Sequence, residues 1–231
     1  INTTGMQGQV SRSIRVYSTG RTVQPGVRDV FVMSGLVSDT VPLYQIPGVT
    51  GSGPDVSGEW IVWQDSRYGN SDIFAYNLTS GEERAICTNP AAQHGAFISG
   101  NLIAWQDERN APTADFYDIY AYDLSRPDLG EFPVLLSSGH ASLIGVDSNR
   151  VAVVNDYYVF AENSNIDTAR NLLVYQYQGN GTFNVIFNSG FTGNSSHNPM
   201  QSFDDGDFGG GLLIVERLEI YWLSAYSYLD Y

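Results

Sequence analysis

The stretch Ser57-Gly58-Glu59-Trp60-Ile61-Val62-Trp63-Gln64-Asp65-Ser66-Arg67 returns 42 residues later as Ser99-Gly100-Asn101-Leu102-Ile103-Ala104-Trp105-Gln106-Asp107-Glu108-Arg109. Each copy contains a Ser-Gly turn, an apolar run and a Trp-Gln-Asp-x-Arg motif. An acidic residue then opens a second alternating strand, at Asp72-Ile73-Phe74-Ala75-Tyr76 and Asp118-Ile119-Tyr120-Ala121-Tyr122. A repeat of this length indicates a fold in which one supersecondary unit recurs.

Weaker copies of the second strand extend the repeat over the whole chain. The five anchors are residues 29, 72, 118, 171 and 219, with spacings of 43, 46, 53 and 48 residues. Such spacings suit one four-stranded propeller blade per copy. We therefore predict a single all-β domain over residues 1–231, a five-bladed β-propeller of antiparallel blades, with four blades as the alternative. The expected blades are 8–50, 54–93, 96–140, 143–190 and 197–231, the last completed by the N-terminal segment.

The two strong copies resemble the TolB-type propeller repeat, in the variety found in surface proteins of archaea and bacteria. The Ser-Gly turn, the Trp-Gln-Asp-x-Arg motif and the Asp-Ile-Phe/Tyr-x-Tyr strand carry the resemblance, and His197-Asn198-Pro199 resembles the blade-opening segment. The resemblance implies a β-propeller that binds proteins or glycans. Some relatives carry out catalysis in the central channel, and some pectate-fragment lyases hold a His-rich metal centre there.

Charge and hydropathy limit the classes of partner. The net charge is −14, and the eleven basic residues are all Arg. An acidic surface repels phosphate backbones, so nucleic acid is not an expected partner. No run of 18 apolar residues occurs, so the sequence predicts no membrane span.

The sequence also indicates export to the cell surface or the outside of the cell. The chain begins at Ile1 and not at Met, which we interpret as a processed N-terminus. Four Asn-x-Ser/Thr sequons make candidate glycosylation sites, at Asn2, Asn77, Asn180 and Asn194. Cys87 is the only cysteine, so no intrachain disulfide can form, and we expect it to be a small buried residue.

The charged residues of the repeat form the first candidate constellation. Arg can bridge two carboxylates, and a carboxylate beside a turn can accept backbone N–H groups. Because a catalytic site needs unlike residues that converge once, the repetition favours a structural carboxylate ladder over catalysis. Its members are Asp65, Arg67 and Asp72 and their copies Asp107, Arg109 and Asp118.

The three histidines form a candidate metal site. His94, His140 and His197 each lie near the start of the first strand of a blade, so they could converge on the central channel. Three imidazoles suit Zn²⁺ or Mn²⁺ and leave one position open. The alternative is three unrelated polar residues near the channel mouth.

A second candidate cation site lies at Asp204-Asp205-Gly206-Asp207. Clustered carboxylates suit Ca²⁺, although this spacing does not match an EF-hand, and an acidic surface turn is the alternative. Calcium or a transition metal is thus the only cofactor that the sequence raises.

The two chain ends could serve closure or assembly. The fifth copy lacks a full outer strand, and residues 1–10 have no evident place in the first copy. Residues 1–10 could pair with the last sheet of the same chain, which closes a ring, or with that of another chain, which makes a filament. The aromatic run from Ile220 to Tyr231 suits either a closing blade or an interface.

These observations lead to a functional hypothesis with an alternative. The chain is expected to be a non-catalytic extracellular binding or assembly module for a protein or carbohydrate ligand, with no catalytic residues assigned. The alternative is a metal-dependent, lyase-like carbohydrate-active enzyme that uses the histidine trio.

Overall fold

The computed structural model describes residues 7–11, 14–18, 30–34, 44–46, 52–111, 116–137, 140–160, 166–189, 200–209 and 212–220. Side chains are described for 53–111, 116–137, 140–155 and 171–189. These parts of the chain are almost entirely β-strand, with one 3₁₀ turn, η1 (Pro127–Leu129).

The strands form antiparallel sheets that follow the chain order, and four of the described sheets have four strands each. The first sheet contains β1 (Gln7–Ser11), β2 (Ile14–Ser18), β3 (Val30–Ser34) and β4 (Tyr44–Ile46). The second contains β5 (Ser52–Ser57), β6 (Trp60–Asp65), β7 (Asp72–Asn77) and β8 (Glu83–Cys87). The third contains β9 (Gln93–Ser99), β10 (Leu102–Asp107), β11 (Asp118–Asp123) and β12 (Glu131–Leu135). The fourth contains β13 (His140–Asp147), β14 (Arg150–Phe160), β15 (Ile166–Tyr177) and β16 (Phe183–Asn188).

A further pair, β17 (Met200–Gly209) with β18 (Leu212–Ile220), completes the described strands. The predicted all-β class with antiparallel four-stranded sheets is confirmed. The number of blades and their boundaries stay predictions.

The Ser-Gly turns of the repeat make the tight hairpins that join the first two strands of a sheet. Gly58 has φ of 58° and Gly100 has φ of 60°, a left-handed conformation that glycine adopts without steric cost. Ser148 occupies the matching turn of the fourth sheet and also has a positive φ, of 59°. The fourth copy therefore keeps the turn geometry although it has lost the glycine.

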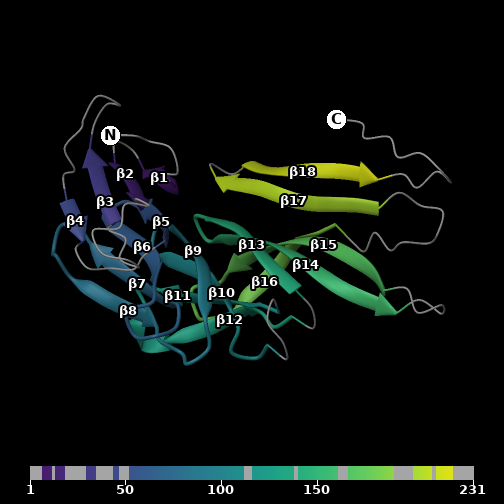
Figure 1. Cartoon of the computed structure of the whole chain (residues 1–231), viewed down its shortest axis with the longest axis horizontal. Coiled ribbons are helices and arrows are strands. Elements are labelled where there is room, and N and C mark those ends of the chain that lie inside the picture. The colour runs from purple at the N-terminus through teal and green to yellow at the C-terminus, as the bar shows by residue number, and fades with distance from the viewer. Residues whose placement is uncertain are drawn as a thin grey trace.

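Successive sheets pack against one another in chain order (Figure 1). The first strands are neighbours: β5 contacts β1, β9 contacts β5, β13 contacts β9, and β17 contacts β13. Both faces of a middle sheet are therefore covered. In β6, Ile61 and Trp63 pack in the cluster on one face, while Val62 packs on the other with residues of the third sheet. The apolar run of each copy is explained by this double burial.

The two repeated tryptophans occupy equivalent buried positions, as the repeat predicts. Trp63 and Trp105 are both 0% exposed. Trp63 pairs across the sheet with Phe74, and Trp105 pairs with Tyr120. The rings of each pair stack, with centroids 6.0 and 6.4 Å apart.

Side chains of the repeat also hydrogen-bond to the backbone of the following sheet. The Gln64 Oε1 accepts a bond from the Gly95 amide at 2.9 Å, and the Gln106 Oε1 accepts one from the Leu143 amide at 3.0 Å. The Ser of each Ser-Gly turn does the same at the opposite end of the sheets. Ser57 Oγ accepts from the Gly100 amide, and Ser99 Oγ from the Ser148 amide, both at 2.8 Å. The motif thus joins neighbouring sheets.

The structure corrects the expectation for the N-terminal segment. Residues 7–11 form β1, which pairs with β2 from Gln7↔Ser18 to Ser11↔Ile14 and belongs to the first sheet. The expectation that residues 1–10 lie outside the first copy, free to complete the last sheet or to exchange between chains, was wrong for Gln7–Val10. The ladder ends at the pair Ser11↔Ile14, so β1 and β2 are neighbours in sequence. Pairing between neighbouring segments costs less chain entropy than pairing between the two ends of the chain. Residues 1–6 and 221–231 lie outside the described residues.

Removing either buried tryptophan should strongly destabilise the fold. We expect Trp63→Ala and Trp105→Ala each to lower the free energy of unfolding by about 3–5 kcal/mol, because each leaves a large cavity. Chemical denaturation of the two variants measures the loss. Tyr68→Ala is the control, since Tyr68 is 68% exposed and should change stability little. A small effect at one tryptophan only would contradict the equivalence of the two sites.

Candidate functional site

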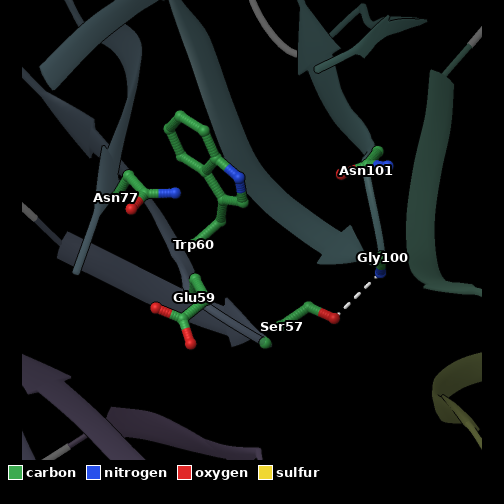
Figure 2. Close-up of a pocket in the computed structure, with 7 residues that line it drawn as sticks. Ser57, Glu59, Trp60, Asn77, Gly100 and Asn101 are labelled. Carbon is green, nitrogen blue, oxygen red and sulfur yellow. Dashed lines mark hydrogen bonds between the residues drawn. The ribbon is translucent and has the colours of Figure 1, made fainter. Parts of the chain in front are cut away.

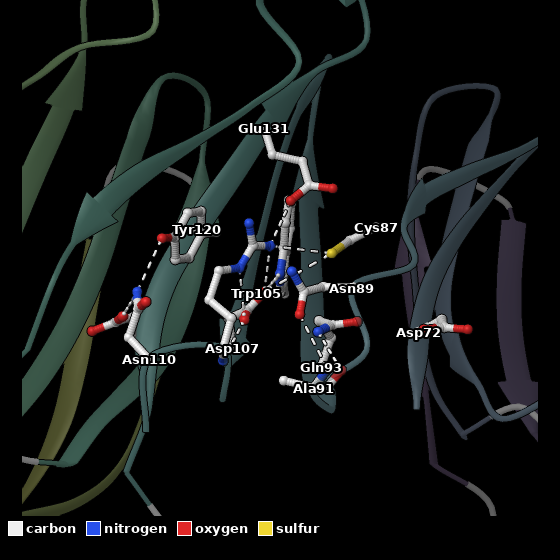
Figure 3. Close-up of polar contacts among 12 residues, drawn as sticks. Asp72, Cys87, Asn89, Ala91, Gln93, Trp105, Asp107, Asn110, Tyr120 and Glu131 are labelled. Atoms are coloured by element: carbon white, nitrogen blue, oxygen red, sulfur yellow. Dashed lines mark hydrogen bonds and ion pairs between the residues drawn. The ribbon is translucent and has the colours of Figure 1, made fainter. Parts of the chain in front are cut away.

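A compact charged cluster surrounds Asp107 in the third sheet (Figure 3). The carboxylate is fully buried and accepts hydrogen bonds from the Trp105 indole at 2.9 Å and from the Arg109 side chain at 2.7 and 2.9 Å. The Arg109 backbone amide adds another at 2.9 Å. The guanidinium lies 3.9 Å from the centre of the Tyr120 ring and reaches Glu131 on β12. The cluster compensates a buried charge with four donors.

The second sheet repeats this cluster residue by residue. Asp65 accepts from the Trp63 indole at 3.3 Å, from the Arg67 Nε at 2.7 Å and from the Arg67 amide at 2.9 Å. Arg67 lies 4.2 Å from the centre of the Phe74 ring and pairs with Glu83 at 2.6 Å. Burial alone raises the pKa of Asp65, but the Arg67 and Trp63 hydrogen bonds outweigh it and hold the pKa below its usual range.

The other two aspartates of the predicted ladder bond to asparagine. Asp72 accepts from Asn70 at 3.2 Å, and Asp118 accepts from Asn110 at 2.8 Å. Burial raises the pKa of Asp72 above its usual value, because the single Asn70 hydrogen bond does not outweigh it as the Arg67 and Trp63 bonds do at Asp65. Each arginine therefore bridges its buried aspartate and a glutamate of the outer strand, Glu83 for Arg67 and Glu131 for Arg109. The sequence analysis did not single out these glutamates, which open β8 and β12.

The fourth sheet replaces the whole cluster with neutral residues. Asn155 stands where Asp65 and Asp107 stand, because it pairs with Asn171 as Asp65 pairs with Asp72 and Asp107 with Asp118. The other equivalents, by sequence or register, are Val153 for the tryptophan, Tyr157 for the arginine and Val185 for the glutamate. The four positions of the cluster thus differ together in the fourth sheet, which favours the predicted structural ladder.

Cys87 lies against the charged cluster of the third sheet. Its sulfur accepts a hydrogen bond from the Arg109 guanidinium at 3.2 Å and lies 3.9 Å from Asp107 (Figure 3). Cys87 is 1% exposed, and burial raises the pKa of the thiol. A buried neutral thiol packs as a small apolar residue, so its role here is contact between the second and third sheets.

Two of the three histidines flank one tyrosine ring. Tyr117 directly precedes β11, and its ring centre lies 5.7 Å from that of His94 on β9 and 5.1 Å from that of His140 on β13. His94 Nε2 lies 3.1 Å from a carboxylate oxygen of Glu108. We call His94, Glu108, Tyr117 and His140 the histidine–tyrosine row. All four side chains are partly exposed, and they lie where the first strands of two sheets meet.

The row does not gather its imidazoles around one point, because Tyr117 stands between them. Within the residues whose side chains are described, no group of three His, Cys, Asp or Glu could hold a metal ion. His197 lies outside the described residues, so the histidine metal centre stays a prediction. Asp204, Asp205 and Asp207 fall within β17, where the register shifts between Phe203 and Gly206. The segment is thus strand and not the turn that the sequence suggested, and calcium binding there stays a prediction.

The sequons fall at turns where they are described. Asn77 ends β7, and Asn180 lies in the turn between β15 and β16. Each asparagine side chain accepts hydrogen bonds from the backbone of its own turn. Asn2 and Asn194 lie outside the described residues.

An open cleft lies between the second and third sheets, at the end that carries the Ser-Gly turns (Figure 2). Its volume is about 450 Å³. The lining comes from three hairpin turns and comprises Ser57, Gly58, Glu59, Trp60, Asn77, Gly100 and Asn101. We call it the Trp60 cleft. Sequence reasoning missed it, because Trp60 reads there as one more apolar strand residue.

Each arginine whose side chain the structure describes is paired with a carboxylate. Beyond Arg67 and Arg109, the pairs are Arg84 with Glu82, Arg126 with Asp128 and Arg150 with Asp147. These parts of the chain therefore present no unpaired cation to a phosphate backbone. They also contain no helix with the length and apolarity that a membrane crossing requires.

Comparison with known proteins finds the fold in solved structures only. No family model and no curated protein matches the sequence. The β-propeller domain of the Trilobed protease from Pyrococcus furiosus is 10% identical, over 96% of this chain and 78% of that chain, with a TM-score of 0.50. A prolyl endopeptidase is 10% identical over 97% of this chain and 34% of its own, with a TM-score of 0.55.

TolB from Acinetobacter baumannii is also a structural neighbour, with 13% identity and a TM-score of 0.46 over 90% of this chain. The chain spans about half the length of that TolB, 48%. The propeller domains with the higher scores confirm the β-propeller fold that the repeat predicts. At these identities the likeness shows the fold alone.

Breaking one buried ion pair should cost more than removing both of its charges. We expect Arg109→Met to lower the free energy of unfolding by about 3–5 kcal/mol, because Asp107 stays buried without its main partner. The double variant Arg109→Met with Asp107→Asn should recover much of the loss, since it imitates the neutral fourth sheet. Denaturation of the two single variants and the double variant measures the coupling. Additive losses would show that the two residues do not act as a unit.

Proposed function

We propose that this chain is a non-catalytic binding module of an exported protein, and that a peptide segment of a protein partner docks on the histidine–tyrosine row. The observation that carries the proposal is the placement of Tyr117 between His94 and His140, which come from the first strands of two different sheets. Side chains from two sheets thus come together where the first strands of those sheets meet.

The chemistry of the row suits a peptide. Tyr is enriched in protein interfaces because it combines a large rigid contact area with a hydroxyl that can hydrogen-bond. Imidazole nitrogens can donate to carbonyl oxygens or accept from amides. The side-chain exposure of His94 is 33% and that of Glu108 is 27%, so both groups are reachable without a rearrangement.

Charge favours a neutral or basic segment. The chain carries a net charge of −14, and Glu108 adds a carboxylate to the row itself. Such a field attracts cations and repels acidic segments. Among the solved structures with a similar fold are a propeller domain of a protease and a prolyl endopeptidase. Location outside the cell belongs to the same proposal and is supported by the sequons at Asn77 and Asn180.

Peptide arrays test this function directly. We expect the purified chain to bind short synthetic peptides, with basic and neutral peptides preferred over acidic ones of the same length. Tyr117→Ala should weaken the best peptide by about tenfold or more, because it removes the central aromatic contact. Calorimetry with the same peptide measures the change, with Tyr68→Ala as a matched control that removes an exposed tyrosine elsewhere. Equal affinity of the two variants, or no peptide binding, would contradict the proposal.

A further inference from the structure

The Trp60 cleft has the composition of a site for a small polar ligand. Its volume of about 450 Å³ lies within the range of small-molecule sites, and it combines one indole with carboxylate and amide side chains. We propose that the Trp60 cleft binds a neutral saccharide. The cleft shares no residue with the histidine–tyrosine row, so this site is independent of the peptide proposal.

The indole of Trp60 is held in place before any ligand arrives. Trp60 opens β6 and pairs across the sheet with Asn77. The Arg84 guanidinium lies 4.9 Å from the centre of the indole ring and is itself held by Glu82 through bonds of 2.6 and 3.0 Å. A side chain that is already ordered loses little entropy on binding. The part of the indole that lines the cleft can therefore take the apolar face of a sugar ring as a fixed platform.

The polar residues of the cleft surround this platform (Figure 2). Within the described residues, the side chains of Glu59 and Asn101 make no hydrogen bond, and both residues are exposed. Asn77 uses its Oδ1 to cap its own turn, at 3.0 Å from the Thr79 amide and 2.9 Å from the Ser80 amide. An amide both donates and accepts, and a carboxylate accepts, so together these groups match the hydroxyls of a sugar.

The next sheet boundary lacks these features, although its turns are equivalent. Leu102 occupies the position of Trp60 in the third sheet and is 4% exposed. Asp123 occupies the position of Asn77 and is 6% exposed, with its carboxylate engaged by Ser125. The cleft is thus no general product of the repeat. Trp60 stands where the third sheet has the buried Leu102, and it places an aromatic surface at this one boundary.

The negative charge at the cleft favours neutral saccharides over acidic ones. Glu59 contributes a negative charge, and Arg84, the arginine that the described residues place beside the cleft, is neutralised by Glu82. In a chain with a net charge of −14, uronic acids and sulfated sugars would meet repulsion, and the described residues around the cleft offer them no unpaired arginine. The cleft therefore fits a neutral saccharide.

The sequon at Asn77 supplies a competing occupant. Asn77-Leu78-Thr79 is an acceptor sequence, and Asn77 lines the cleft. A glycan attached at Asn77 would occupy the same space as a free saccharide. The test therefore uses protein made in a host that does not glycosylate, so that the cleft is open.

A glycan array of neutral and acidic oligosaccharides, followed by calorimetry with the strongest neutral one, tests the proposal. We expect binding of neutral saccharides and about a tenfold weakening in Trp60→Ala, with a smaller loss in Asn101→Ala. Asn101→Ala changes an exposed turn residue, so it stays informative even if Trp60→Ala does not fold. The neighbouring residue Leu102 is buried, and its packing should not change in Asn101→Ala.

Two controls separate this site from the rest of the molecule. Tyr68→Ala removes an exposed aromatic residue away from the cleft and should leave saccharide affinity unchanged. Tyr117→Ala should also leave it unchanged while it weakens peptides, so the two proposals can fail separately. The proposal is overturned if no neutral saccharide binds, if acidic saccharides bind better, or if Asn101→Ala and Trp60→Ala both keep the full affinity.

Discussion

The buried aspartate at the end of the second strand is the constraint around which each strong repeat is built. Asp65 and Asp107 are at most 1% exposed, and a carboxylate at such depth must receive several donors or it destabilises the fold. Trp63 and Trp105 supply an indole N–H, and the arginine two residues later supplies its guanidinium and its amide. The motif is therefore one interaction spread over five positions, and the stacked aromatic ring and the outer glutamate complete it.

This constraint explains why the sequence predicted so much of the fold. A cluster that needs all its members keeps the Trp-Gln-Asp-x-Arg motif in both strong copies, and the spacing of the copies predicted the sheets. The equivalent burial of Trp63 and Trp105, both 0% exposed, reflects the same repeat. The fourth sheet could be predicted only from its apolar strand pattern. Asn155 and Asn171 form the equivalent strand pair but lack the charge that marks the motif. The hairpin from β1 to β2 was missed, since Gln7–Ser11 carries no part of the motif.

The candidate sites could be predicted far less well, because they depend on which turns meet in space. The two histidines were expected at the starts of first strands, but nothing in their spacing showed that Tyr117 would stand between them. Trp60 resembles any strand residue in the sequence, and only the structure shows that residues of three hairpin turns line an open cleft beside it. Both proposed sites thus depend on residues outside the repeated motif, Tyr117 and Trp60. The repeated residues stabilise the sheets that position them.

The central claim is that side chains of the motif join the second sheet to the third and the third sheet to the fourth. Residue-resolved hydrogen exchange of the wild-type chain and of Gln106→Ala tests it most directly, because the Leu143 amide bonds to the Gln106 side chain. The account predicts that Leu143 exchanges slowly in the wild type and much faster in the variant, while the Gly95 amide, bonded to Gln64, keeps its protection. Fast exchange at Leu143 in the wild type, or unchanged exchange in the variant, would contradict it.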